Sequence, residues 1–112
     1  MATINDEVMR QMLTTSRNYS IVILKAGPNK SVDGVEKIIW EHGRRNLELR
    51  ADGLLSIVCP VPDESDLSGV GIFNASIEEV KKIMDEDPGV KAGVFVYEVH
   101  GCRSFPGDSL PG

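Results

Sequence analysis

The amino-acid sequence predicts an α+β domain in which a four-stranded antiparallel sheet carries two helices on one face, with a further helix at the N-terminus. Apolar residues recur at helical spacing in two long segments. Four shorter runs, dense in Ile and Val, are bounded by Gly, Pro or Asp and are typical of strands. Their order, which is strand, helix, strand, strand, helix, strand, is the split βαβ plan.

The N-terminal half begins with a short amphipathic segment, residues 5–16, for which we predict a helix. Residues 19–25 are a run of Ile and Val that predicts the first strand, and the sequence Ala-Gly-Pro-Asn at 26–29 ends it. A long helix is expected over 34–51, because apolar residues follow one face and Asp52-Gly53 is a typical helix end.

In the C-terminal half, Ser76 and Glu79 have the spacing of a capping box, so the second core helix should begin at Ser76. Pro88 should end that helix, since proline lacks a backbone N–H group. Residues 100–112 are rich in Gly and Pro and are expected to be extended and irregular. The remaining strands are predicted at 54–59, 70–73 and 90–99.

These elements make a ferredoxin-like βαββαβ domain at 19–105, with an N-terminal helical extension at 1–18 and an irregular tail at 106–112. Both helices cover one face of such a sheet and leave the other face bare. In the last predicted strand, alternate side chains point to opposite faces, and both sets include apolar residues. We therefore expect the uncovered face to pack against a second copy of the chain, as a homodimer.

Length and composition restrict the class of protein. A chain of 112 residues makes one domain, and a net charge of −5 with a pI near 4.9 argues against a nucleic-acid partner, which requires a basic surface. No apolar run reaches the ~20 residues of a membrane span, and residues 1–10 lack the apolar stretch of a secretory signal. We therefore expect no membrane partner, and a cytoplasmic protein in which Cys59 and Cys102 are reduced.

One histidine and one aspartate stand out because each continues the apolar face of a predicted helix. His42 follows Ile38 at helical spacing, and Asp87 follows Ile83 and Met84. At the end of its helix, Asp87 would face the negative end of the helix dipole, an arrangement that costs roughly 0.3–1 kcal/mol and calls for a compensating donor. We predict a hydrogen bond between His42 and Asp87, direct or through one water molecule.

Three motifs occur in order along the chain: His42 in the first core helix, the turn Asp52-Gly53-Leu54-Leu55, and the element Asp87-Pro88-Gly89-Val90-Lys91-Ala92-Gly93 before the last strand. In this layout the chain resembles the YciI-like (YCII-related) domain family. The resemblance implies a ferredoxin-like fold of the dimeric α/β-barrel type, with a pocket centred on His42 and Asp87. It also implies, for a few members, cofactor-free lyase or dehydrochlorinase chemistry on hydroxylated aromatic rings.

Two interpretations of this pocket stay open. In the first, the chain is a cofactor-independent lyase or isomerase: His42 moves a proton on a small polar compound, phenolic or enolic, and Asp87 orients the imidazole. Arg45, one turn along the helix, would bind the negative charge of that substrate. In the second, the chain is a non-catalytic small-molecule-binding or accessory module, and the His42–Asp87 pair is structural. We expect no metal site, because His100 and Cys102 lack further converging ligands, and no cofactor.

Overall fold

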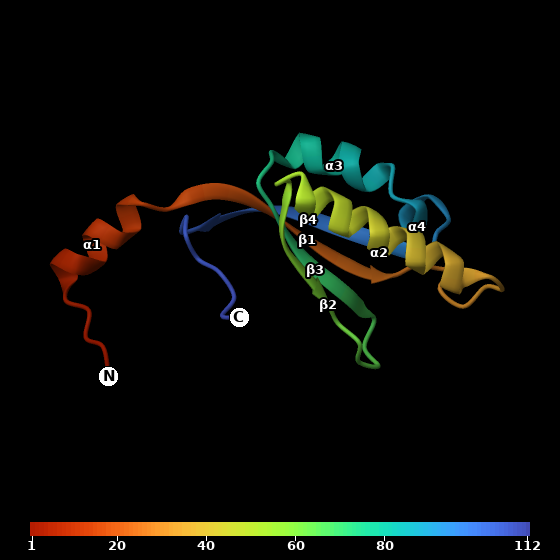
Figure 1. Ribbon diagram of the computed structural model, residues 1–112, viewed down its shortest axis with the longest axis horizontal. Coiled ribbons are helices and arrows are strands. Elements are labelled where there is room, and N and C mark those ends of the chain that lie inside the picture. Colours follow the sequence, from red (N-terminus) through yellow and green to blue (C-terminus); the bar gives the residue numbers. More distant parts are fainter.

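The computed structural model describes residues 1–112 and contains the predicted order of elements (Figure 1). The four strands form one antiparallel sheet in the order β2-β3-β1-β4, which is the ferredoxin-like topology. The predicted α+β fold class is therefore confirmed. The elements are α1 (Asp6–Thr14), β1 (Arg17–Ala26), α2 (Val35–Ala51), β2 (Leu55–Pro60), β3 (Leu67–Phe73), α3 (Ile77–Asp85), α4 (Pro88–Lys91) and β4 (Phe95–Ser104).

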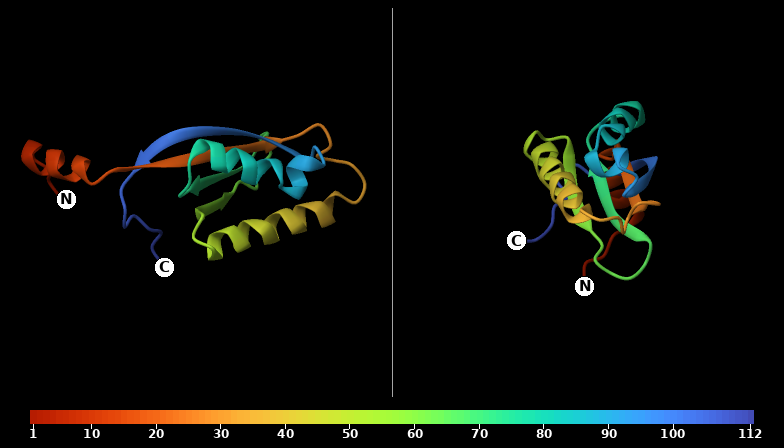
Figure 2. Two further views of the ribbon diagram at one scale, coloured as in Figure 1. Left: turned by 90° about the horizontal axis from the view of Figure 1, so that it is seen from above. Right: turned by 90° about the vertical axis from the view of Figure 1, so that its right-hand side faces the viewer.

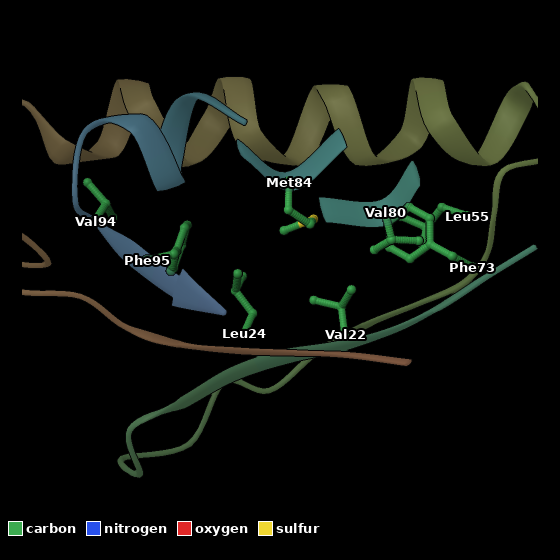
Figure 3. Close-up of a cluster of buried hydrophobic side chains, with 8 residues drawn as sticks. All are labelled: Val22, Leu24, Leu55, Phe73, Val80, Met84, Val94 and Phe95. Carbon is green, nitrogen blue, oxygen red and sulfur yellow. The ribbon is translucent and has the colours of Figure 1, made fainter. Parts of the chain in front are cut away.

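The hydrophobic core lies between the sheet and the helices that cover one of its faces (Figure 3). Alternation along β1 buries Val22 and Leu24 on this face, because side chains two residues apart in a strand point the same way. From above, α3 contributes Val80 and Met84, which are one helical turn apart. The buried core is made of Val22, Leu24, Leu55, Phe73, Val80, Met84, Val94 and Phe95.

The helix α2 meets the sheet differently from α3. His42 is its only buried residue, and Ile38 and Leu49 are partly buried at the edge of the core. By contrast, 69% of Trp40 and 58% of Leu47 are exposed to solvent. Because these apolar side chains of α2 remain exposed, the helix does not pack tightly against the sheet. A space is therefore left between α2 and the strands.

The predicted end of α2 and the predicted start of α3 are confirmed. Asp52 is the C-cap of α2, and Gly53 follows it with φ +79°, a conformation that favours glycine. Ser76 is the N-cap of α3, and its Oγ accepts a hydrogen bond of 3.2 Å from the backbone N–H of Glu79.

The last strand is present, but its expected bounds of 90–99 are wrong by five residues at each end, and the tail is irregular only beyond Ser104. Val90 lies in the short helix α4, and β4 begins only at Phe95, after Gly93 has turned the chain with φ +71°. At its other end β4 continues to Ser104, because its last residues pair with the first residues of β1, from Arg17 opposite Ser104 onwards. The sequence of the tail alone does not reveal this partner strand.

The first helix, α1, has the predicted place and apolar stripe. Asn5 caps it by accepting a hydrogen bond of 2.9 Å from the backbone N–H of Val8. None of its residues is buried, and it projects from the body of the domain in Figure 1 and in the left-hand view of Figure 2. No helix in the chain has the length and apolar content needed to cross a membrane.

The face of the sheet opposite the helices is also apolar. In β1, Ile21 and Ile23 point to this side, where they stand beside Ile72 and Val70 of β3. These four side chains are only partly buried. On the same face, near the start of β4, Val96 is 46% exposed and stands opposite Lys25.

Candidate functional site

His42 and Asp87 lie in direct contact beneath α2. The Nδ1 atom of His42 is 2.8 Å from both Oδ1 and Oδ2 of Asp87, so the predicted hydrogen bond is present. His42 is 8% exposed and Asp87 is completely buried. The pair joins α2 to the segment that follows α3, although the two residues are 45 positions apart in the sequence.

The expected position of Asp87 at the C-terminus of the second core helix is wrong. α3 ends at Asp85, and Asp87 is instead the N-cap of α4, whose first residue is Pro88. Proline fits the first position of a helix because its missing N–H would have no partner there, and aspartate is a favoured N-cap. Asp87 therefore faces backbone N–H groups, and the expected dipole penalty does not arise.

The buried carboxylate of Asp87 is held by several donors. Its Oδ2 accepts hydrogen bonds of 2.9 Å and 3.1 Å from the backbone N–H groups of Gly89 and Val90. Burial would raise the pKa of Asp87, but the hydrogen bond and charge of His42, together with these two N–H groups, hold that pKa below its ordinary value. The carboxylate is therefore ionised at neutral pH and acts only as an acceptor.

The state of Asp87 decides which nitrogen of His42 carries hydrogen. Because the carboxylate only accepts, Nδ1 must donate, and in the neutral ring Nε2 is left with its lone pair. Nδ2 of Asn46, one turn along α2, lies 3.2 Å from Nε2 and is the donor that matches it. Both ring nitrogens thus have partners, and Nε2 is the one available for exchange with a ligand.

Phe95 supports the pair from the sheet side. Its ring centroid lies 4.7 Å from that of His42, with the two planes tilted by 46°. This approach requires glycine at position 89, since a Cβ atom there would lie 2.5 Å from Cδ2 of Phe95. The glycine in the Asp-Pro-Gly sequence therefore allows Phe95 to pack closely against this segment.

A cavity of about 1070 Å³ lies in the space between α2 and strands β1, β2 and β3. Its size slightly exceeds the range of roughly 300–1,000 Å³ found for small-molecule sites. His42, Asn46 and Phe95 line it beside apolar side chains from the strands, and the exposed Trp40 forms part of its wall. The imidazole is thus accessible to a ligand in this cavity.

Arg45 is placed on the other side of His42. Its Nη1 lies 3.7 Å from Oδ1 of Asp87, and Arg45 does not line the cavity. This nitrogen is buried and has no hydrogen-bond partner in the chain. The geometry brings Arg45 to the carboxylate, and a role in binding substrate stays a prediction.

Lys30 is a cavity residue that the sequence interpretation missed. Its Nζ lies 4.5 Å above the centroid of Phe95 and donates a hydrogen bond of 3.2 Å to Oγ of Ser68. The only local signal was its position directly after the Gly-Pro-Asn turn, because a lysine in a loop is ordinarily a solvated residue.

The remaining candidate ligands do not converge. No group of three or more His, Cys, Asp or Glu side chains is arranged to hold a metal ion. Cys59 and Cys102 are both free thiols. His100 is exposed on β4, where it approaches Glu98 at 4.0 Å.

Comparison with known proteins gave matches among solved structures. No family model and no curated protein sequence matches the chain. One similar solved structure is 5-chloro-2-hydroxyhydroquinone dehydrochlorinase from Burkholderia phenoliruptrix in complex with 2,5-dihydroxybenzoquinone. The two chains are 21% identical, the match covers 72% of this chain and 90% of that chain, and the TM-score is 0.47. The fold class rests on the strand order, and the resemblance to the YciI-like family stays a prediction.

Proposed function

We propose that the protein is a cofactor-independent lyase or isomerase of small phenolic or enolic compounds. His42 transfers the proton, and Asp87 orients the imidazole. The observation that carries this proposal is the 2.8 Å contact between Nδ1 of His42 and the buried carboxylate of Asp87, on a ring that also lines a cavity of about 1070 Å³. An oriented imidazole with one nitrogen directed to a ligand site is the arrangement that general acid–base chemistry requires.

In the proposed reaction, Nε2 of His42 takes a proton from the substrate, and the imidazolium is stabilised by Asp87 at 2.8 Å. In an isomerisation, the same nitrogen returns the proton to a different substrate atom. In an elimination, the electron pair of the broken bond expels the leaving group, and the proton passes later to water. The amide of Asn46 leaves Nε2 when the substrate binds and donates to a substrate oxygen instead.

The alternative function is a non-catalytic small-molecule-binding or accessory module with a structural His42–Asp87 pair. A specific observation favours it: Asn46 lies 3.2 Å from Nε2, so both nitrogens of the ring already have partners within the chain. A buried histidine satisfied in this way can stabilise a fold without any chemistry. The two functions differ in whether the chain promotes proton exchange on a bound compound.

The direct test is a screen of hydroxyquinones, phenols and muconolactone-like acids in deuterated water, followed by proton NMR. An enzyme of the proposed class introduces deuterium at the carbon from which His42 removes a proton, or releases a product. His42→Ala should lower both signals by roughly 10²–10⁴. The matched control is His100→Ala, because His100 is the second of the two histidines in the chain and lies outside the cavity.

The proposed partner of the chain is a second copy of itself. The uncovered face of the sheet presents Ile21 and Ile23 of β1 beside Ile72 and Val70 of β3, whereas Glu98 and His100 of β4 stand opposite Ile23 and Ile21. Contiguous apolar surface of this kind is uncommon on a monomer. A two-fold pairing of these faces would bury the same residues on both copies.

The proposed location is the cytoplasm. Cys59 is exposed and Cys102 is partly buried, and neither forms a disulfide. Free thiols are usual in a reducing compartment. Titration of the purified protein with a thiol reagent should therefore count two thiols per chain without prior reduction.

A further inference from the structure

Lys30 is a cation that lines the cavity and forms no ion pair, although the carboxylates of Glu36, Glu48 and Asp63 also line it. Its Nζ lies 4.5 Å above the Phe95 ring and donates to Oγ of Ser68 at 3.2 Å. The ion pairs of the chain are all formed by other basic side chains. A partly buried ammonium group with only a ring and a hydroxyl beside it can still accept an anion.

The backbone around Lys30 is fixed to the segment that carries the other site residues. The N–H of Gly27 donates to Val94 O, and the N–H of Asn29 donates to Gly93 O, each at 2.8 Å. The Asn29 side chain adds a third bond of 2.8 Å, to Ala92 O. A Cβ atom on Gly27 would overlap the carbonyl oxygen of Gly93, so this close approach depends on glycine. Lys30 is thus carried by a turn with a defined position.

Lys30 and His42 both lie close to the ring of Phe95. The Phe95 centroid is 4.5 Å from Nζ of Lys30 and 4.7 Å from the centroid of the imidazole. Both residues line the same cavity. A compound that lies against Phe95 in that cavity is therefore near both the imidazole and the ammonium group.

We propose that Lys30 and Ser68 form an anion-binding subsite that holds the phenolate or enolate oxygen of a cavity ligand. The assignment of the ligand class rests on the proposed function, whereas the subsite itself requires no turnover. Removal of a proton from a phenolic or enolic compound places negative charge on its oxygen, and a cation at that oxygen favours the charged form. Lys30 would thus fill the role that the sequence predicted for Arg45, whose guanidinium instead faces Asp87.

Two small probes of similar shape test the subsite: 4-nitrophenol, at a pH where it is ionised, and 4-nitroanisole, which stays neutral. Binding can be followed by quenching of Trp40, the only tryptophan, which lines the cavity. The wild type should bind the phenolate about tenfold or more tightly than the anisole, since a hydrogen bond to a charged group contributes that much. Lys30→Met should remove this preference and leave anisole affinity unchanged.

Matched variants make the outcome specific. Lys30→Arg keeps the positive charge and should keep the preference, and Lys37→Met, on the exposed surface of α2, should have no effect. If Lys30→Met does not fold, Ser68→Ala should lower the preference by removing the hydroxyl that Nζ contacts. Equal binding of both probes by the wild type, or an unchanged preference in Lys30→Met, would overturn the subsite.

The binding measurement also separates the subsite from the proposed function. His42→Ala should still prefer the phenolate, because Lys30 is untouched. A preserved phenolate preference in a wild type that turns over no compound would therefore sink the enzyme proposal and support the subsite. If the wild type shows no phenolate preference and Lys30→Met turns over a substrate as fast as the wild type, the subsite is excluded and the enzyme proposal is supported.

Discussion

Phe95 occupies the space that a side chain on Gly89 would need. A Cβ atom at position 89 would lie 2.5 Å from Cδ2 and 2.9 Å from Cε2 of the Phe95 ring. The same ring packs against His42 at a centroid distance of 4.7 Å. The position of the imidazole therefore depends on the absence of a side chain in the first turn of α4.

Gly89→Ala should lower the free energy of unfolding by about 1–3 kcal/mol, because the added methyl group forces the Phe95 ring to move in a packed region. Urea denaturation measures this change. The control is Gly43→Ala in α2, where no atom lies within 4 Å of the new Cβ. That variant should gain roughly 0.5–1 kcal/mol, since alanine is the better helix former. Equal stability of the two variants would contradict the packing role of Gly89.

Asp87→Asn should destabilise the protein by about 1–3 kcal/mol at neutral pH, because it removes an ionised acceptor from His42 and two backbone N–H groups. The pKa of Asp87 is lowered in the folded protein, so its contribution is complete above the ordinary carboxyl value of 3.8. The contribution is then lost as the pH falls from that value through the lower, folded pKa. The difference in unfolding free energy between the two proteins should therefore shrink below about pH 4. A difference that stays constant to lower pH would refute the coupling, and Asp33→Asn, at an exposed position, serves as the control.

Tyr97 should ionise far above its ordinary range. Burial, followed by the hydrogen bond and charge of Asp85, raises the pKa of Tyr97 from 10.0 to about 12. Its hydroxyl donates to Oδ1 of Asp85 at 2.7 Å. In a Tyr19→Phe variant, which leaves Tyr97 as the only tyrosine, ultraviolet titration should give a midpoint near 12. Asp85→Asn should move that midpoint back toward 10.0, and no movement would argue against the assigned cause.

Light scattering should give a mass about twice the 12.2 kDa of one chain at micromolar concentration. Ile72→Lys introduces a charge into the uncovered face of the sheet and should yield the monomer mass with an intact circular dichroism spectrum. Lys37→Glu, on the helix side, should leave the mass unchanged. A wild-type mass of one chain would exclude the sheet-to-sheet homodimer.

Patterns along single elements predicted the larger part of the fold. The 3.6-residue period placed His42 on the inner face of α2, and the capping pattern placed the start of α3 at Ser76. These signals are local, because each depends on neighbours within a turn or two. The contact between His42 and Asp87 was also predicted, but for an incomplete reason: Asp87 points inward as the N-cap of α4 and not as the end of α3.

Features that depend on distant segments were not predicted. The end of β4 at Ser104 depends on pairing with Arg17 of β1, and the sequence of neither segment indicates that the two are paired. Lys30 faces the cavity because its turn is bonded to residues 92–94, which lie far along the chain. Arg45 has the helical spacing expected of a site residue, yet its guanidinium points to Asp87 and not into the cavity. The spacing of residues in the sequence predicts which face of a helix a side chain occupies, but not which residues of other elements that face contacts.

We propose that His42 transfers a proton and is not only a structural partner of Asp87. The measurement that tests it most directly is the rate of deuterium incorporation, or of turnover, for the compound found by screening, compared among wild type, His42→Ala and His100→Ala. The claim predicts a fall of roughly 10²–10⁴ in His42→Ala, with its cooperative unfolding transition retained and with His100→Ala unaffected. If the wild type processes no compound in the screen and His42→Ala only lowers Tm, because the buried Asp87 is left without its donor, the binding-module interpretation is correct.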